Sequence, residues 1–301
     1  MSIKTSVILF TALALLITLG YAQERPAPPK TINVDVDLVL INATVTMPDG
    51  RFVTNLDQKH FQLWEDRVEQ KIEYFSSEDL PVSVGIIFDA SGSMSPFLGM
   101  ARSAAVTFLK MGDRDDEYFL IEFNDKPRIT VEFTSDIAKL QNHIVFTAAK
   151  GLTALFDAIY LGMDTIKKGV HPKKALLVVT DGEENHSRYR FSDVRDFVRE
   201  QDVQLYAIGP DAPLSSLAEI TGGRSFDASF RDLEDICTKI AVELKNQYLI
   251  GYRSTNESKD GRFRKVELKV NPPRGLPKLN VRGKSGYYAP VLESAPTTGR
   301  F

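Results

Sequence analysis

The sequence holds few of the side chains on which small secreted folds and many enzymes depend. It has one cysteine, Cys237, and only four histidines among 301 residues. A single cysteine excludes an intrachain disulfide, and no two histidines have the spacing of a zinc site. We interpret Cys237 as a small buried hydrophobe, because apolar residues surround it at helical spacing. The chain therefore predicts neither a disulfide-built module nor a zinc protein.

Several enzyme and nucleic-acid signatures are also missing. The sequence has no G-x-x-x-x-G-K phosphate loop and no G-x-S-x-G nucleophile elbow. Its lysines and arginines are scattered, and the formal net charge is −3. A nucleic-acid-binding protein usually carries a concentrated basic face, which this pattern lacks. We therefore expect no nucleic-acid partner and no enzyme activity.

The longest apolar run is short and lies at the start of the chain. Lys4 precedes the apolar stretch 7–19, and small residues at 20–22 offer a cleavage site. This pattern is typical of a secretory signal peptide spanning 1–22. The run is shorter than the roughly 20 residues of a spanning helix. We predict an exported bacterial protein, periplasmic or secreted, with no transmembrane span in the mature chain; an uncleaved N-terminal anchor is the alternative.

The middle of the chain, residues 81–247, alternates strand-like and helix-like patterns. Such alternation predicts a doubly wound α/β fold, with a mostly parallel six-stranded sheet and helices on both faces. The strand at 128–133 follows the strand at 117–123 too closely for a crossover helix, so it must run antiparallel, as the sheet edge. The other expected strands are 83–88, 175–180, 204–208 and 224–227, and the expected helices are 97–111, 136–146, 154–168, 191–201, 213–220 and 231–245.

The two flanks of this region are rich in strand patterns. A proline-rich leader at 23–30 precedes the first flank, 31–80, and the second flank spans 248–290. Each flank is too small to build a core alone. We predict that they pair into one β-sandwich-like domain, with the α/β domain inserted between them. Residues 259–262 indicate a hairpin, and a disordered tail is expected at 291–301.

One stretch, VSVGIIFDASGSM at 82–94, combines a buried strand with polar residues. The apolar run ends at Asp89, and Ser91 and Ser93 follow in a glycine-containing loop. Open α/β sheets bind ligands at the carboxyl ends of their strands. One carboxylate and two hydroxyls converging there suit a hard cation such as Mg²⁺, Mn²⁺ or Ca²⁺, and not zinc.

Two distant residues complete a recognisable set. Thr153 stands before the helix pattern at 154–168, and Asp181 ends the strand pattern LLVVTDG at 176–182. Thr153 has an alternative role as a helix cap, and Asp181 as a turn residue. The five residues resemble the metal-ion-dependent adhesion site of von Willebrand factor type A (VWFA) domains, over residues 81–247: Asp89, Ser91, Ser93, Thr153 and Asp181.

This resemblance implies a binding site and not a catalytic one. It implies direct ligation of a cation by the hydroxyls of Ser91 and Ser93, with Thr153 joining when a partner is bound. Asp89 and Asp181 are implied to act through bound water, or Asp181 directly when no partner is present. Mg²⁺ is the favoured cation, with Mn²⁺ or Ca²⁺ as alternatives. One coordination position is left for an Asp or Glu carboxylate of a partner protein.

The flanks resemble a more specific group. The segments DGRFVTNL, FQLWED, QKIEYF, DGRFRKVELKV and GYYAP are similar to those of the VWFA-related family abundant in Acidobacteria. Arg67 departs from that family, which usually has glycine after the Glu65–Asp66 pair. We therefore predict an exported protein-binding module of the cell-adhesion kind. The alternatives are a structural envelope-assembly protein with a vestigial metal site and, least favoured, a metal-dependent hydrolase.

Overall fold

A computed structural model of the chain describes residues 38–209, 212–226 and 232–291. The predictions made for the signal peptide, for the leader and for the tail from 292 onward lie outside the described residues. No helix of the described part is both long enough and apolar enough to cross a membrane.

The α/β half contains one six-stranded sheet, in the order β10-β9-β8-β5-β6-β7. Five strands are parallel, and β7 pairs antiparallel with β6 at the edge, as the short connection between them predicts. The predicted fold class is therefore confirmed. The strands are β5 (Val82–Asp89), β6 (Glu117–Phe123), β7 (Arg128–Thr134), β8 (Lys173–Val179), β9 (Gln204–Ile208) and β10 (Arg224–Phe226).

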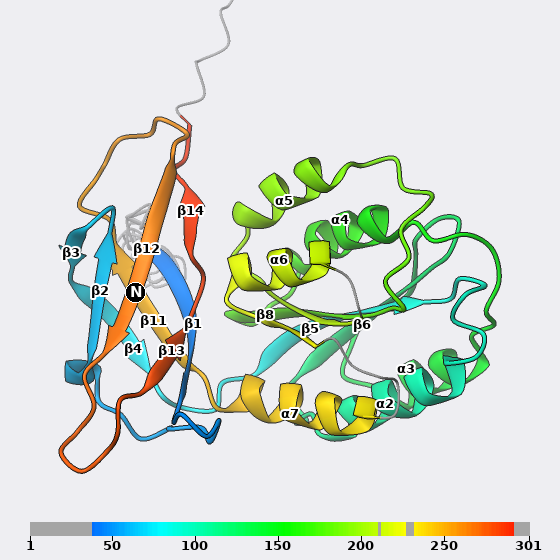
Figure 1. Cartoon of the computed structure of the whole chain (residues 1–301), viewed down its shortest axis with the longest axis horizontal. Helices are drawn as coiled ribbons and strands as arrows, with labels where there is room; N and C mark the ends of the chain where they lie inside the picture. Colours follow the sequence, from blue (N-terminus) through cyan, green and yellow to red (C-terminus); the bar gives the residue numbers. More distant parts are fainter. Residues whose placement is uncertain (1–37, 210–211, 227–231, 292–301) are drawn as a thin grey trace, which may run out of the picture. The chain divides into compact units, whose positions relative to one another are not determined.

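Three helices cover each face of this sheet (Figure 1). On one face lie α2 (Leu98–Lys110), α3 (Ile137–Phe146) and α7 (Leu233–Lys245). On the other lie α4 (Leu155–Ile166), α5 (Phe191–Arg199) and α6 (Ala212–Thr221). All residues of β5 are buried, which explains its unbroken apolar sequence, because a central parallel strand is covered on both sides. Cys237 is buried against the first face, and burial raises the pKa of its thiol to about 12.

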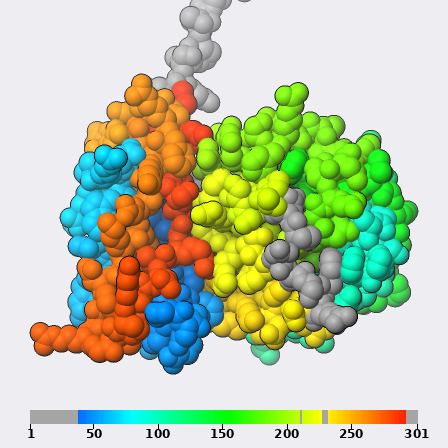
Figure 2. Space-filling model, in the orientation of Figure 1, coloured from blue at the N-terminus to red at the C-terminus, as the bar shows by residue number. Residues whose placement is uncertain are grey.

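The flanks form two antiparallel sheets, in the orders β13-β1-β11-β4 and β14-β12-β2-β3. Each sheet combines strands from both flanks, and the two sheets share one hydrophobic core. Along β12, coloured orange in Figure 2, exposed residues alternate with more buried ones, as expected for a strand with one face on the core. The elements are β1 (Leu38–Thr46), the 3-10 turn η1 (Gln58–His60), β2 (Phe61–Glu65), β3 (Val68–Gln70), β4 (Ile72–Ser76), β11 (Tyr248–Arg253), β12 (Phe263–Val270), β13 (Asn280–Arg282) and β14 (Gly286–Tyr288).

The hairpin predicted at 259–262 is wrong. This segment connects β11 to β12, but these two strands lie in different sheets. Both edges of β11 are already occupied, by β1 and by β4. The second strand, β12, pairs instead with β2 and β14. The connection therefore crosses from one sheet to the other.

The hairpin between β2 and β3, which the sequence does not signal clearly, turns at Asp66 and Arg67. Glu65 pairs with Val68, so these two residues alone form the turn. Both have positive φ, 46° for Asp66 and 71° for Arg67. Two-residue turns of this kind favour glycine at the second position, because a Cβ atom is crowded there. Arg67 thus stands where the resembling family has glycine, in a conformation that glycine adopts more easily.

Candidate metal-binding site

Asp89 is the last residue of β5, and its side chain is completely buried. Its Oδ1 accepts a 2.8 Å hydrogen bond from the backbone N–H of Ser91, and its Oδ2 accepts a 2.6 Å bond from the Thr180 hydroxyl. Burial raises the pKa of this carboxyl to about 6, although these hydrogen bonds oppose the rise. The negative charge of Asp181 contributes to the same upward shift, which places the two carboxylates within electrostatic reach of each other.

Ser91 and Ser93 follow Asp89 in a loop at the carboxyl end of β5, and hydrogen bonds from neighbouring segments hold this loop in place. The hydroxyl oxygens of Ser91 and Ser93 lie 3.0 Å apart and, within the described structure, bond only to each other. The backbone N–H of Ala90 donates to the carbonyl of Phe123 at 2.8 Å. These contacts fix the start of the serine loop against the end of β6 and hold the two hydroxyls beside each other. Ser91 is fully buried, whereas Ser93 is partly exposed.

Thr153 is carried by a loop that contacts the serine loop. The N–H of Gly92 donates to the Gly151 carbonyl at 3.0 Å. Gly151 has a φ of +83°, and a Cβ atom there would lie 2.5 Å from an oxygen of Asp125. That carboxylate accepts a 2.9 Å hydrogen bond from the N–H of Leu152, which fixes the approach to Thr153. Position 151 therefore needs glycine both for its backbone conformation and for this close contact.

The helix-cap alternative for Thr153 does not hold. No side chain caps α4 at its N-cap position, and the Thr153 hydroxyl makes no hydrogen bond to any described residue. The first helical N–H groups are bonded instead by the loop that follows Asp181. Glu184 accepts from the N–H of Phe156 at 3.0 Å, and the hydroxyl of Ser187 accepts from Asp157 at 3.1 Å. The buried Thr153 hydroxyl is thus left available.

Asp181 lies two residues after the end of β8, next to Thr180. Its Oδ1 is buried and has no hydrogen-bond partner in the described part of the chain. The turn at this point uses other groups: Gly182 has a φ of +87°, and its N–H donates to the Thr180 hydroxyl at 3.1 Å. The Asp181 carboxylate therefore serves no visible structural purpose. A buried carboxylate oxygen without a donor is costly unless a ligand satisfies it.

Together these side chains fit a hard divalent cation. The set offers two carboxylates and three hydroxyls, all oxygen donors, with lone pairs that protein donors leave free. Over the described residues, no group of three or more histidine, cysteine, aspartate or glutamate side chains has metal-binding geometry. That result does not conflict with this site, because only two of its five members are of those types. Occupation by a metal stays a prediction.

Sequence reasoning missed two residues that position the site. Thr180 holds the Asp89 carboxylate, and Asn185 accepts a 3.0 Å hydrogen bond from the backbone N–H of Thr153. The position of Thr180 could have been inferred, because Phe88 pairs with Val179 in the parallel sheet, so the next residues also lie opposite each other. Asn185 lies in a polar run that resembles any solvated loop, and its role depends on a contact across 32 residues.

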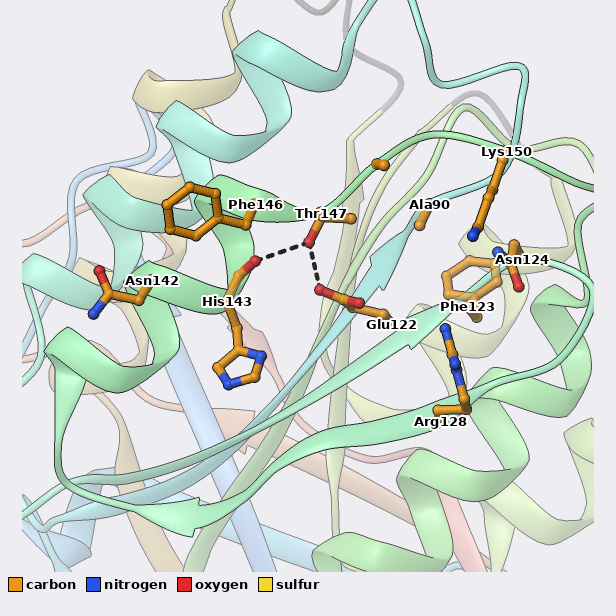
Figure 3. A pocket seen from close by; sticks show the side chains of 11 residues that line it. Ala90, Glu122, Phe123, Asn124, Arg128, Asn142, His143, Phe146, Thr147 and Lys150 are labelled. Atoms are coloured by element: carbon orange, nitrogen blue, oxygen red, sulfur yellow. Dashed lines mark hydrogen bonds between the residues drawn. The ribbon is translucent and has the colours of Figure 1, made fainter.

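A cavity of about 390 Å³ adjoins the site (Figure 3). It begins at Ala90, directly after Asp89, and continues over the ends of β6 and β7 to the end of α3 and the following loop. The loop is tied to α2, because the Arg102 guanidinium donates to the carbonyl of Thr147. The cavity was not predicted from the sequence, since its walls come from four separate segments.

Comparison with known proteins agrees with this geometry. The family model described as von Willebrand factor type A domain matches residues 84–184, a segment that runs from β5 to the loop after β8. Among curated proteins, no sequence is significantly similar to the chain. Residues 84–184 of the α/β half therefore match a von Willebrand factor type A domain. The finer assignment to the VWFA-related group stays a prediction.

Solved structures with similar folds come from several organisms. The mussel byssus protein PTMP1 (proximal thread matrix protein 1) is 15% identical, with 60% of this chain and 51% of that chain covered and a TM-score of 0.50. BatB from Bacteroides thetaiotaomicron is 20% identical, with coverages of 55% and 99% and a TM-score of 0.46. The vWF domain of the pili tip protein Mfa5 from Porphyromonas gingivalis is 14% identical, with coverages of 55% and 95% and a TM-score of 0.47. The first of these likenesses shows a shared fold and nothing about activity.

Proposed function

We propose that this chain is an exported protein-binding module that recognises its partner through a divalent cation. The residues that would hold the cation are Asp89, Ser91, Ser93, Thr153 and Asp181. The partner would supply an Asp or Glu carboxylate to the same ion. Export rests on the signal-peptide pattern at 1–22, and binding rests on the type A domain and on this set of residues.

The observation that carries the proposal is the buried Oδ1 of Asp181, which has no donor among the described residues. Close to it, the Ser91 and Ser93 hydroxyls bond only to each other, and the Thr153 hydroxyl is unbonded within the same part of the chain. Folded proteins satisfy nearly all of their buried polar atoms. The unsatisfied Oδ1 of Asp181, together with hydroxyls that offer free lone pairs, therefore supports a missing cationic ligand.

The charge of the site supports an acidic partner. Two carboxylates that act through bound water would hold the divalent cation without neutralising it by direct contact, because the protein donors in direct contact would be neutral hydroxyls. Mg²⁺ keeps six oxygen ligands and usually retains exchangeable positions in protein sites. The cation would supply a strong electrophilic centre at which a partner's carboxylate can replace water. Mg²⁺ is the first candidate, and Mn²⁺ or Ca²⁺ are the alternatives.

Two other functions are weaker. A structural envelope protein with a vestigial site would have no reason to keep all five residues of the set. A metal-dependent hydrolase would need a group that activates water next to the cation. Of the two glutamates that follow Gly182, Glu184 accepts hydrogen bonds from the N–H of Phe156 and the hydroxyl of Ser187 and is thus held in a helix-capping role.

The test is calorimetric titration of the chain from Gln23 with Mg²⁺ and Mn²⁺. We expect one saturable site in the wild type, and loss of that binding in the Asp89→Ala, Ser91→Ala double variant. Asp181→Asn is the gentler second variant, because its Oδ1 makes no hydrogen bond that the change would break. Ser95→Ala is the matched control, since this exposed serine lies in the same loop but outside the site.

Circular dichroism would establish that each variant is folded. Unchanged cation binding by Asp181→Asn and by the double variant would contradict the proposal, as would a wild-type chain that binds neither Mg²⁺ nor Mn²⁺. Loss of binding in Ser95→Ala as well would show that the loop as a whole, and not the predicted ligands, controls the titration.

A further inference from the structure

Two cationic side chains line the cavity beside the site and lack counter-ions. Arg128 begins β7, and Lys150 lies directly before Gly151 in the loop that leads to Thr153. Both are exposed, and neither side chain forms an ion pair or a hydrogen bond with any residue in the described ranges. Figure 3 shows the two side chains approaching Phe123 from opposite directions, Lys150 from above and Arg128 from below.

The one carboxylate in the cavity wall does not neutralise them. Glu122 is the direct cross-strand neighbour of Arg128, yet no ion pair joins the two side chains. Its carboxylate instead accepts a hydrogen bond from the Thr147 hydroxyl, on the opposite wall (Figure 3). Two cations against one engaged carboxylate leave the cavity with a net positive charge.

The cavity is contiguous with the candidate metal site. The N–H of Lys150 donates to the Ala90 carbonyl at 2.9 Å, so its backbone touches the residue that follows Asp89. Phe123 is the strand neighbour of Asp89, and the preceding residue of β6 is the neighbour of Arg128. Lys150 and Arg128 therefore belong to segments that directly adjoin Asp89, one through the loop and one through the sheet.

The rim of the cavity is apolar and unusually exposed. Phe146, the last residue of α3, has 83% of its surface exposed, the highest fraction among the large hydrophobic residues described. Leu152, at 47%, lies between Gly151 and Thr153 on the adjoining loop. Exposed apolar groups around a polar site are common at surfaces that bind other proteins.

We propose that the cavity binds a second carboxylate of the partner, between Arg128 and Lys150. The inference rests on the proposed function and specifies its partner: a short extended segment with two acidic residues, one for the cation and one for the cavity. A guanidinium and an ammonium bind carboxylates by charge-assisted hydrogen bonds, and both here have all their donors free. The preference for a protein segment over a free anion comes from the metal site, which needs a carboxylate at the adjoining position.

The test uses fluorescein-labelled hexaglutamate as the probe, with hexaglutamine as the neutral control, measured by fluorescence anisotropy at low salt. Hexaglutamate contains every spacing between two carboxylates that a short segment can offer. We expect saturable binding in Mg²⁺, and an affinity reduced about fivefold to tenfold in the Arg128→Gln, Lys150→Gln double variant. The matched control is Lys110→Gln, Arg114→Gln, which removes the same charge at the amino-terminal end of β6, the opposite end of the sheet.

The outcomes separate this inference from the function on which it rests. An equal loss in both double variants, or no binding of hexaglutamate by the wild type, would overturn the inference. Binding that needs Mg²⁺ but ignores Arg128 and Lys150 would overturn it and leave the cation proposal standing. Binding that survives a chelator yet falls in the Arg128, Lys150 variant would support the cavity and contradict the cation proposal. Calorimetry with Mg²⁺ alone checks that the variant retains its metal site.

Discussion

Each half of the molecule buries a carboxylate, and the two are treated very differently. In the β-sandwich, Glu65 is 2% exposed. Its Oε2 accepts hydrogen bonds from the hydroxyls of Tyr252 and Tyr287, both at 2.8 Å, and its Oε1 accepts one from Ser254 at 2.6 Å. Three neutral hydroxyls thus surround one charge. Every oxygen of that carboxylate has a protein donor.

In the α/β half, at the carboxyl ends of the central strands, one carboxylate oxygen has no donor among the described residues. Two carboxylates, Asp89 and Asp181, lie within electrostatic reach of each other, and the nearby serine hydroxyls turn toward one another. Hydroxyls can donate to a carboxylate or can offer lone pairs to a cation, and the two sites use the same groups in these opposite ways. Both oxygens of Asp89 have donors, as those of Glu65 do, so the difference lies in Asp181, whose buried Oδ1 has no donor among the described residues and is free for a ligand.

The largest expected effect comes from substituting Glu65, the carboxylate whose oxygens all have donors. Glu65→Ala removes the acceptor for three hydroxyls, of which that of Tyr252 is fully buried, so we expect the free energy of unfolding to fall by about 4 kcal/mol. Urea denaturation monitored by circular dichroism measures this change. Glu65→Gln should cost less, because its amide oxygen still accepts. If Glu65→Ala costs under about 1 kcal/mol, the network contributes little and the comparison fails.

The candidate metal site should affect how the stability of the metal-free protein depends on pH. The pKa of Asp89 is raised from 3.8 to about 6, so folding favours the protonated form. This contribution, up to about 3 kcal/mol, is complete below pH 3.8 and is lost as the pH rises through about 6. Denaturation in a chelator across this range measures it. Asp89→Asn should remove that part of the dependence; an unchanged profile in the variant would contradict the assignment.

Asp181→Asn tests how the free energy of unfolding differs between the chain with and without a bound cation. In a chelator, the change should leave the free energy of unfolding the same or raise it by less than about 1 kcal/mol, because it removes a repulsive charge without breaking a hydrogen bond. In Mg²⁺ at a hundredfold excess over Kd, the wild type should gain about 2.7 kcal/mol that the variant lacks. Thermal denaturation with and without Mg²⁺ measures both. A clear loss of stability in the chelator would make Asp181 a structural residue.

The smallest expected effect lies in the turn next to Glu65. Arg67→Gly should raise the free energy of unfolding by about 0.5–1 kcal/mol, because glycine adopts the positive φ of 71° without a Cβ clash. The reverse control is Gly50→Ala, at a φ of +88° in an open turn, which should lower stability by a similar amount. Urea denaturation compares the two. Destabilisation by Arg67→Gly would mean that the arginine side chain contributes contacts that outweigh the backbone strain.

Local pattern was sufficient for most of the α/β half. β6 and β9 have the bounds that the sequence predicts, and the helices differ only at their ends. The apolar periods of strands and helices depend on near neighbours, so they are readable without the fold. The β half was harder. Its strands were visible, but the path from β11 to β12 was not, because which sheet a strand joins depends on partners about 200 residues away.

The sequence by itself determined the identities and the places of the five candidate ligands, since each lies at a strand end or directly before a helix. Only the tertiary structure decided what surrounds them. It brings Thr180 to Asp89 through the parallel register of β5 and β8, and among the described residues it leaves the Oδ1 of Asp181 without a donor. It also places Arg128 and Lys150 around one cavity. Hydrogen-bond completeness and charge pairing are sums over contacts from distant segments, so no local pattern in the chain can reveal them.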